Sequence, residues 1–520
     1  MTAAATIRDL LASGPDEAVA IAAPSAVPLT YGGLREQVGA TIARLNGLGI
    51  GRGDRVGIVL PNGPEMAVAF LSIAAGATSA PLNPQYRAEE FEFYLTDLAA
   101  TALVVEAGVS SAATEAAARL GVPVIALHPT PGKGAGRFGL AAAVAPGRAL
   151  AAGVPAASSD VALVLHTSGT ASRPKIVPLT QANVCASARN VSRTLALSVA
   201  DRGLVVMPLF HIHGLIAGVL APLSTGGSVF CAPGFNALKF FGWVSEAGPT
   251  WYTAVPTMHQ TILARAGHNR ETIAANPLRF IRSSSASLPP QVLAELEATF
   301  GTRVIESYGM TEAAHQMTSN LLAPGQRKPG AVGVAAGPEV AIMDEGGELL
   351  PQGLTGEIVI RGDNVTLGYE HNPKANAEAF ANGWFRTGDQ GVMDPDGFLT
   401  ITGRLKEIII RGGEKISPRE VDEVLMDHPA VLQALTFAIP HDKLGEEVGA
   451  AVVLREGRSV TERELRAWVA GRLVDFKAPR KVIILDEIPK GPTGKLQRIG
   501  LAQKLGLSPP LGDPTEGGPP

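Results

Sequence analysis

Short apolar segments and helix-like segments alternate through the first 160 residues, and this rhythm limits the folds open to the chain. Residues 55–60, 101–105 and 122–127 are short and rich in β-branched side chains, as buried strands are. Residues 64–75 and 112–120 space their apolar side chains as helices do. Alternation of strand and helix favours an α/β fold with a largely parallel sheet.

A hydroxyl-rich loop follows the next predicted strand. Residues 161–165 (VALVL) have the pattern of a buried strand, and residues 166–180 continue as HTSGTASRPKIVPLT. Small residues, backbone N–H groups and a lysine suit a loop that holds a polyphosphate. The spacing of a Walker loop is absent, and an ordinary surface turn rich in Ser, Thr and Gly is the alternative interpretation.

Two more predicted strands end in small polar turns. Residues 279–287 (RFIRSSSAS) pass from a strand into serines, and residues 304–312 (VIESYGMTE) pass into an aromatic residue, a glycine, a hydroxyl and a carboxylate. Ligands of α/β sheets collect at the carboxyl ends of strands. A tight turn without function is the alternative for each segment taken alone.

Two histidines, His211 and His213, follow a predicted strand at residues 204–207. Their spacing would suit two metal ligands, but no third ligand is evident nearby. We therefore expect these side chains to pack, or to line a pocket at the end of the strand.

The chain changes character after residue 356. Short segments around Asp394–Gly397 predict antiparallel strands, and we expect Asp389 in a turn. Ser417 is predicted as a helix N-cap that forms a capping box with Glu420. The α+β pattern that follows ends in a Gly/Pro-rich turn with Lys495, for which a solvated lysine is the alternative. Residues 508–520 are expected to be disordered.

Composition excludes several classes of function. The 520 residues include 44 Lys and Arg against 48 Asp and Glu, a net charge of −4, so we expect no nucleic-acid or membrane partner. Cys185 and Cys231 have no metal or disulfide spacing, and neither a signal peptide nor an unbroken apolar helix is evident. We expect a cytoplasmic monomer or homodimer with two or more domains.

Five motifs, in order, resemble the adenylate-forming superfamily of acyl-CoA synthetases, peptide-synthetase adenylation domains and luciferases. They are HTSGTASRPK, SYGMTE, WFRTGD, GRLKEIIIRGGEKISP and PKGPTGKLQR. Finer features such as PLFHIHGL, LRFIRSSSASL and MTEAAHQM are similar to the oxalate–CoA ligase branch of that superfamily.

The resemblance implies an α/β architecture of two domains. The large N-terminal domain (1–403) would contain parallel-rich sheets with flanking helices and a β-barrel-like subdomain. A small mobile α+β domain (404–507) would act as a lid, followed by the tail. The implied activity is that of an acid–thiol ligase that uses ATP, Mg²⁺ and coenzyme A and activates a small carboxylic acid.

The resemblance also implies roles for individual residues. The ATP phosphates would be held by Thr167, Ser168, Gly169, Thr170 and Lys175. The adenine shelf would be formed by Ser285, Ala286, Ser287, Glu306, Ser307 and Tyr308. The ribose hydroxyls would be held by Asp389 and Arg404. The pantetheine route would be bordered by Gly412, Gly413 and Glu414. At the reacting centre, Thr311 would contact the phosphates, Glu312 would bind Mg²⁺ and Lys495 would catalyse the first half-reaction, with Lys406 as the hinge.

The chemistry of such an enzyme explains why these residue types are needed. A carboxylate must attack an anionic α-phosphate, so cations have to neutralise the charge that develops. The adenylate must also be kept from water, which a mobile domain achieves. One orientation would deliver Lys495, and another would present the Gly412–Gly413 turn for attack by the CoA sulfur.

The acid pocket is predicted to be polar. Its candidate residues are His211, His213, Ser283, Ser284 and His315, with Arg282 nearby. Histidines and hydroxyls suit the second carboxylate of a very short diacid, so we expect oxalate as the substrate. The alternatives are another fatty or aromatic acid, transfer of the acyl group to a carrier protein, or a catalytically dead nucleotide-binding protein.

Ile176 departs from the family pattern, which commonly has glycine after the loop lysine. A β-branched residue would be strained there at positive φ but harmless in an extended conformation. We predict that ATP binding is retained and at most weakened.

Overall fold

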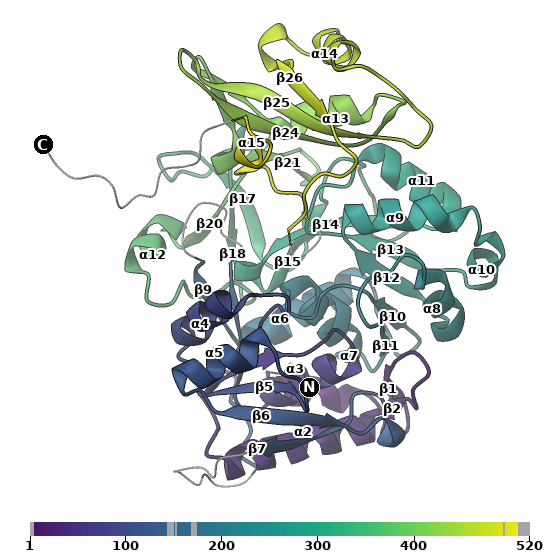
Figure 1. Cartoon of the computed structure of the whole chain (residues 1–520), viewed down its shortest axis with the longest axis vertical. Coiled ribbons are helices and arrows are strands. Elements are labelled where there is room, and N and C mark those ends of the chain that lie inside the picture. Colours follow the sequence, from purple (N-terminus) through teal and green to yellow (C-terminus); the bar gives the residue numbers. More distant parts are fainter. Residues whose placement is uncertain (1–4, 143–149, 151–152, 168–173, 492–494, 508–520) are drawn as a thin grey trace, which may run out of the picture.

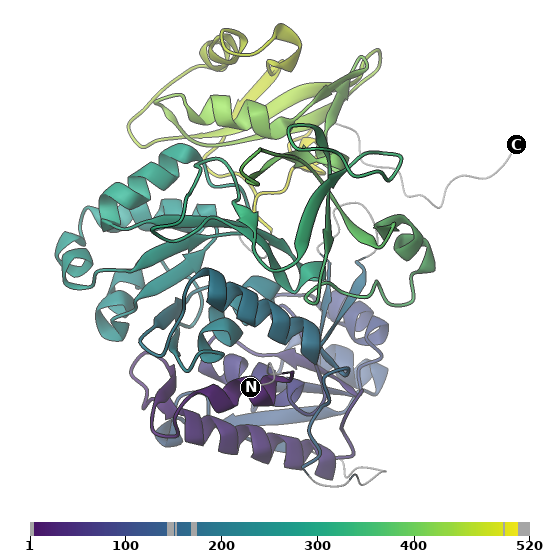
Figure 2. The same cartoon turned by 180° about the vertical axis from the view of Figure 1, so that it is seen from behind.

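Four β-sheets organise the protein in the computed structural model, which describes residues 5–142, 150, 153–167, 174–491 and 495–507 (Figure 1). Three sheets belong to the large N-terminal domain. The fourth forms the smaller C-terminal domain, which lies at one end of the molecule, against the second and third sheets (Figures 1 and 2). The tail at 508–520 lies outside the described residues.

The first sheet has the strand order β7-β6-β5-β3-β4-β8-β9. Its central strands run parallel, and the edge strands β7 and β9 run antiparallel to their neighbours. The strands are β3 (Arg55–Val59), β4 (Thr78–Pro81), β5 (Ala102–Glu106), β6 (Val124–Pro129), β7 (Phe138–Ala142), β8 (Val161–His166) and β9 (Ile176–Thr180). The predicted alternation of strand and helix is confirmed in this part of the chain.

Helices cover both faces of the first sheet because its buried side chains alternate between the faces. Leu103 and Val105 pack with α4 (Ala88–Asp97) and α5 (Ala112–Leu120), whereas Val104 joins the core shared with α2 (Tyr31–Gly47) and α3 (Pro64–Ala74). The remaining helical segments of this region are α1 (Ile7–Leu10), η1 (Leu11–Ser13) and η2 (Pro131–Lys133).

The second sheet has the order β16-β15-β14-β13-β12-β10-β11-β1-β2 and is parallel from β1 to β14. Its strands are β1 (Val19–Ala22), β2 (Leu29–Thr30), β10 (Arg202–Val205), β11 (Ser228–Cys231), β12 (Trp251–Ala254), β13 (Phe280–Ser283), β14 (Val304–Met310), β15 (His315–Ser319) and β16 (Val334–Ala335). The predicted strands that end in polar turns are therefore neighbours, so their turns meet at one edge.

Two groups of helices flank the second sheet. One face packs against α8 (Phe240–Ala247), α9 (Pro256–Ala266), α10 (Arg270–Ala275) and α11 (Pro290–Phe300). The other shares a core with α6 (Gln181–Thr194), the π-helix η3 (His213–Leu220) and α7 (Ala221–Leu223). This second group also contacts the first sheet or α3, which joins the two sheets into one body.

The third and fourth sheets complete the molecule. The third is antiparallel and contains β17 (Glu339–Met343), β18 (Thr355–Arg361), β19 (Phe380–Ala381), β20 (Trp384–Met393) and β21 (Leu399–Arg404), beside α12 (Pro373–Ala379). The fourth contains β22 (Ile409–Arg411), β23 (Glu414–Ile416), β24 (Val431–His441), β25 (Gly445–Leu454) and β26 (Lys481–Ile484). Its helices are α13 (Pro418–Met426), α14 (Glu462–Ala470) and α15 (Leu501–Lys504), and the short 3₁₀ segments are η4 (Thr311–Ala313), η5 (Leu405–Glu407) and η6 (Asp475–Lys477).

Two local predictions are wrong. Asp389 lies within strand β20 rather than in a turn. Ser417 is the N-cap of α13 with Pro418 after it, but no capping box forms, because the Ser417 hydroxyl donates to the Thr402 carbonyl and Glu420 pairs with Lys477. Tertiary contacts take both side chains away from the local pattern. Within the described ranges, no helix is long and apolar enough to cross a bilayer.

Candidate active site

A hairpin carries the hydroxyl-rich loop. β8 and β9 pair antiparallel with His166 opposite Ile176, so the loop connects the two strands. At its base the Thr167 N–H donates to the Lys175 carbonyl (2.9 Å), and the Lys175 N–H donates to Thr167 Oγ1 (3.1 Å). The predicted phosphate-binding residues Ser168, Gly169 and Thr170 lie outside the described residues.

Ile176 is the first residue of β9 and is 4% exposed. It packs in the core beneath α4 and α5, and its backbone is not among those with positive φ. A β-branched side chain suits an extended, buried position. The strain that a left-handed backbone would impose on Ile176 therefore does not arise.

Glu312 is a buried carboxylate just beyond β14. The Tyr369 hydroxyl donates to Glu312 Oε1 (2.8 Å), and Lys175 Nζ lies 4.3 Å from the centroid of the Tyr369 ring. Burial raises the pKa of Glu312, while the Tyr369 hydrogen bond and the Lys175 charge oppose that shift. The half-buried Thr311 begins the same 3₁₀ turn.

Asp389 joins three strands. Its Oδ2 accepts from the Tyr308 hydroxyl of β14 (2.5 Å), and its Oδ1 accepts from Arg404 Nε of β21 (2.8 Å). The Asp389 carboxylate raises the pKa of Arg404, and burial raises the pKa of Tyr308. The structure thus brings Tyr308 together with Asp389, 81 positions later in the sequence, and with Arg404.

The predicted adenine shelf has two parts, residues 285–287 between β13 and α11 and residues 306–308 on β14. Ser285 has φ of 75°, and Ala286 and Ser287 after it are exposed. Glu306 Oε1 accepts from the Leu288 N–H (3.1 Å), which ties β14 to this exposed loop. Burial raises the pKa of Glu306 to about 7.

The three other serines of these turns differ in what their hydroxyls contact. Ser284 Oγ donates to the Ser307 carbonyl (3.0 Å), and Ser307 Oγ donates to the Ser283 carbonyl (3.4 Å). Ser283 Oγ is buried and has no hydrogen-bond partner in the described part of the chain. The Ser284 hydroxyl hydrogen is therefore already used within the sheet, whereas Ser283, which follows Arg282 in β13, has its side chain on the opposite face of the sheet from the histidine cluster.

The predicted pocket histidines form a cluster. The rings of His213 and His315 stack with centroids 4.8 Å apart, and His211 Nδ1 accepts from the His213 backbone N–H (3.3 Å). Burial lowers the pKa of His213 and His315 well below the usual value and that of His211 to about 3, so the rings are neutral. His315 Nε2 is buried without a partner among the residues described.

Lys495 reaches this cluster from the C-terminal domain. The segment after β26 runs toward the ends of β14 and β15 (Figure 1, yellow). Burial lowers the pKa of Lys495 to about 8, assisted by Arg404 and opposed by Asp389 and Glu312. The Lys495 charge in turn lowers the pKa of His211. The segment that contains Lys495, close to the C-terminus, therefore lies near His211 and Glu312 of the N-terminal domain.

The predicted hinge and pantetheine residues lie outside this centre. Lys406 is exposed in η5, between the third and fourth sheets. Gly412 and Gly413, with φ of 58° and 94°, form the β22–β23 turn, and the Gly412 N–H donates to the Leu444 carbonyl (2.8 Å). The exposed Glu414 follows. No hydrogen bond joins this turn to the histidine cluster in the part of the chain that the structure describes.

Sequence reasoning did not single out four residues that shape the centre. Tyr369 donates to Glu312, Thr253 contacts His213, and Gln316 accepts from Arg282. At Gly309 a Cβ atom would lie 1.6 Å from the His315 carbonyl oxygen, so a side chain there would displace His315. Gly309, Gln316 and Thr253 fall within segments that resemble the family, but no role was assigned to them, and Tyr369 lies in none of those segments.

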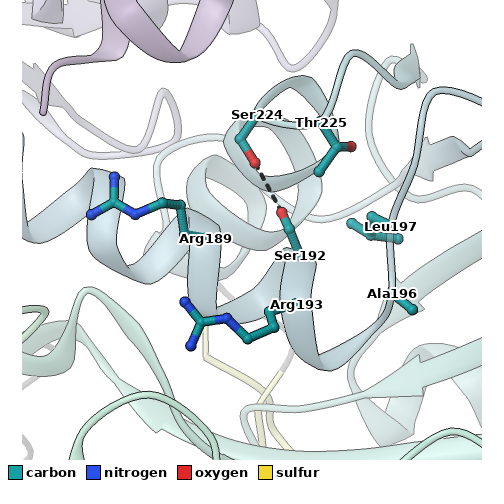
Figure 3. A pocket seen from close by; sticks show the side chains of 7 residues that line it. All are labelled: Arg189, Ser192, Arg193, Ala196, Leu197, Ser224 and Thr225. Carbon is teal, nitrogen blue, oxygen red and sulfur yellow. Dashed lines mark hydrogen bonds between the residues drawn. The ribbon is translucent and has the colours of Figure 1, made fainter. Parts of the chain in front are cut away.

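A separate surface cavity of about 330 Å³ lies beside α6 and α7 (Figure 3). It is lined by Arg189, Ser192, Arg193, Ala196, Leu197, Ser224 and Thr225. Its serine hydroxyls bond to each other at 2.9 Å. None of the candidate site residues lines this cavity, so we assign it no part in the centre described above.

The residues near Glu312 fit a metal ion that is brought by a substrate. Among the described residues, no three His, Cys, Asp or Glu side chains form a metal-binding group. Mg²⁺ commonly binds one or two carboxylates together with substrate phosphates. The buried Glu312 beside Lys175 can serve as such a single protein ligand.

Comparison with known sequences identifies two matching family profiles. The profile described as AMP-binding enzyme matches residues 9–370, and the profile described as AMP-binding enzyme C-terminal domain matches residues 420–495. The oxalate–CoA ligase of Arabidopsis thaliana is 46% identical over 91% of this chain and 93% of its own length. The sulfoacetate–CoA ligase of Cupriavidus necator is 38% identical over 96% of this chain and 97% of its own.

Solved structures have the same fold. ATP-bound MatB from Rhodopseudomonas palustris superposes with a TM-score of 0.86 at 30% identity, covering 96% of this chain and 98% of that one. The apo structure of the same protein, at the same coverage, gives a TM-score of 0.76. The arrangement seen here is therefore more similar to the nucleotide-bound form.

Proposed function

The chain belongs to the AMP-binding enzyme family and is an AMP-forming acyl-CoA synthetase, and from this premise we propose that its acid is oxalate. The overall reaction converts oxalate, ATP and CoA into oxalyl-CoA, AMP and diphosphate. The similarity to an oxalate–CoA ligase over most of both chains supports this substrate.

The observation that carries the choice of oxalate is the polar, buried lining of the acyl pocket. His315 Nε2 is buried without a protein partner in the described ranges, and its ring stacks on the neutral His213 ring. An unpaired buried polar atom is costly unless a ligand satisfies it. A short diacid offers a second carboxylate to His315, whereas a fatty acid would leave its Nε2 unpaired.

In the first half-reaction a carboxylate oxygen of the acid attacks the α-phosphorus of ATP, and the bond to diphosphate breaks. The base of the loop, with Thr167 and Lys175, holds the phosphates, and Asp389 and Arg404 hold the ribose. Lys495 donates to oxygens that gain charge in the transition state. Mg²⁺ bound at Glu312 would neutralise phosphate charge. In the second half-reaction the CoA sulfur attacks the acyl carbon and displaces AMP.

The segment 404–507 serves as a lid in this scheme. Lys495 is needed while the adenylate forms, and its withdrawal opens a route for CoA. The exposed Lys406 is suited to absorb the rotation, and the positive φ of Gly412 and Gly413 suits a turn that approaches pantetheine.

A panel of acids tests the substrate. AMP formation is measured with oxalate, malonate, sulfoacetate, acetate, octanoate and coumarate, with and without CoA. Because a site built for a second anion rejects an acid that lacks it, kcat/KM should be about 10³-fold higher for oxalate than for acetate. Equal or greater activity on a monoacid would contradict the proposal.

Sulfoacetate is the second candidate substrate, because a relative of 38% identity is named for it. It also carries an anion beyond the reacting carboxylate and would use the same unpaired His315 Nε2. The panel separates the two acids, and parallel assays with CoA and with a holo-carrier protein test the acceptor.

We also propose that the enzyme acts in the cytoplasm as a monomer or homodimer. Cys185 and Cys231 are both buried and free, as is usual for proteins of reducing compartments.

A further inference from the structure

Arg282 is a buried cation without an acidic partner. It lies on β13 with 0% exposure, and within the described ranges no carboxylate pairs with its guanidinium. Its Nη1 contacts His213 Nε2 (3.4 Å) and Thr253 Oγ1 (3.4 Å), and its Nη2 donates to Gln316 Oε1 (3.3 Å). Burial of an unpaired charge is strongly unfavourable, so a function must offset its cost.

The contacts of Arg282 fix the direction of the hydrogen bonds around it. A guanidinium can only donate, so His213 Nε2 must be the acceptor. The Thr253 hydroxyl accepts from Arg282 and lies 2.7 Å from the same nitrogen, so it donates to His213 as well. The proton of the neutral His213 ring is therefore on Nδ1.

Because Nε2 of His213 accepts, its Nδ1 donates toward the pocket. Its Nδ1 is 3.0 Å from Ser285 Oγ, which puts this residue of the predicted adenine shelf in contact with the histidine cluster; the ring donates and the serine oxygen accepts. The Ser285 hydroxyl keeps its own hydrogen, which is available to a bound anion. Ser285 is partly exposed at the end of β13, whereas Arg282 is not, so the buried charge acts through a chain of donors.

We propose that Arg282 is the residue that makes the acyl pocket selective for acids with a second anionic group, and that it does so without touching the substrate. It orients Thr253, His213 and Ser285 so that each donates toward the pocket, and its charge favours an anion at their end. This inference rests on the proposed function, because it names what selects the acid at that site.

An arginine suits this task better than a charged histidine. Burial lowers the pKa of Arg282 to about 9, but the guanidinium stays largely protonated up to about pH 8, so the preference for a dianion varies little below that pH. The charged and titratable groups that act on His213 are His315, Arg282, His211 and Lys495, none of which is acidic. The pocket therefore has a positive potential even though its three histidines are neutral.

The test measures oxalate and acetate as substrates for Arg282→Gln, with Arg279→Gln as the matched control. Arg279 lies three residues earlier and pairs with Asp201 outside the pocket. Arg282→Gln should raise the KM for oxalate about 10²-fold at pH 8, leave the KM for ATP within threefold, and leave acetate unaffected. The control should change none of these values.

A comparison of the two acids distinguishes a charge effect from a packing effect. Burial is the larger cause of the low pKa of His213 and His315, so both rings stay neutral when Arg282 is replaced. The loss in Arg282→Gln should therefore fall on oxalate and be similar at pH 6 and pH 8. Equal loss with oxalate and acetate at both pH values would overturn the proposal.

A second variant keeps the test valid if Arg282→Gln does not fold. Thr253→Val keeps the size of the side chain and the Arg282 charge but breaks the donor chain, so the KM for oxalate should rise about tenfold and that for acetate should not. No change with oxalate would overturn the proposal. A wild-type enzyme that prefers an acid without a second anion would contradict the proposed function itself. That outcome is measured on the wild type alone, so it is distinct from a failure of the Arg282 proposal.

Discussion

The amine of Lys495 is in an environment that weakens its hold on a proton. Burial and the Arg404 charge lower its pKa to about 8, although Asp389 and Glu312 favour the charged form. The ammonium that we propose to stabilise phosphate charge is thus held near the point of deprotonation before the substrates bind. Negative phosphates would restore its charge.

This environment predicts a pH dependence of adenylation. Lys495 is charged below a pKa of about 8, so kcat/KM for ATP, which reports the free enzyme, should fall as pH rises through about 8. Diphosphate release measured from pH 6 to pH 10 checks this. Lys495→Arg, whatever its residual rate, should lose the alkaline decline; the same decline in both enzymes would show that another group titrates.

The raised pKa of Glu306 predicts that the stability of the protein depends on pH. The pKa of Glu306 is about 7 in the folded protein and 4.5 in the unfolded chain. The free energy of unfolding should therefore fall as the pH rises from 4.5 past 7, by about 3 kcal/mol in total. Glu306→Gln should raise the melting temperature at pH 8 and leave it unchanged at pH 4. The control is Glu295→Gln, because Glu295 of α11 is exposed. A gain of the same size at both pH values would contradict this explanation.

At the scale of elements, Arg498 anchors the segment that carries Lys495. Its Nη2 pairs with Asp422 of α13 (2.6 Å) and its Nε with Glu407 of η5 (3.1 Å), and Nη1 donates to the Thr436 carbonyl (2.9 Å). Glu407 follows the predicted hinge Lys406. The position of the lysine segment is thereby tied to the segment about which the domain is expected to rotate.

Glu407→Gln should therefore impair one half-reaction more than the other. Without the ion pair, the Lys495 segment is held less firmly, and adenylation should slow about tenfold. Transfer from preformed oxalyl-AMP to CoA should stay within about twofold, because it does not need Lys495. Glu487→Gln is the control, since Glu487 pairs with Lys490 on the surface of the same segment. Equal slowing of both steps would contradict the positioning role.

The elements that the sequence predicts well are those with strong local periodicity. α5 spans the predicted residues 112–120, and β3 and α3 differ from prediction by one residue at an end. Asp389 was misplaced because its strand lies between other strands whose pairing no local pattern reveals. The role of Tyr369 and Thr253 in the site depends on packing between distant segments, so single-sequence reasoning could not find them.

At the scale of the whole molecule, the two domains are held in one orientation by polar contacts across their interface. Gln260 of α9 donates to the Leu432 carbonyl (3.1 Å) and accepts from Gln433 (2.9 Å). Arg419 donates to the Ile401 carbonyl of β21 (2.7 Å). Such polar contacts are exchangeable with water, which suits a domain that moves.

The separate half-reactions of Lys495→Ala test the central claim most directly. With the amine removed, diphosphate formation from ATP and acid should fall at least about 10²-fold, because a donor to the transition state is lost. Transfer of the acyl group from preformed acyl-AMP to CoA should stay within about threefold of the wild-type rate. Equal loss of both half-reactions would contradict the account, since Lys495 would then not act in adenylation alone.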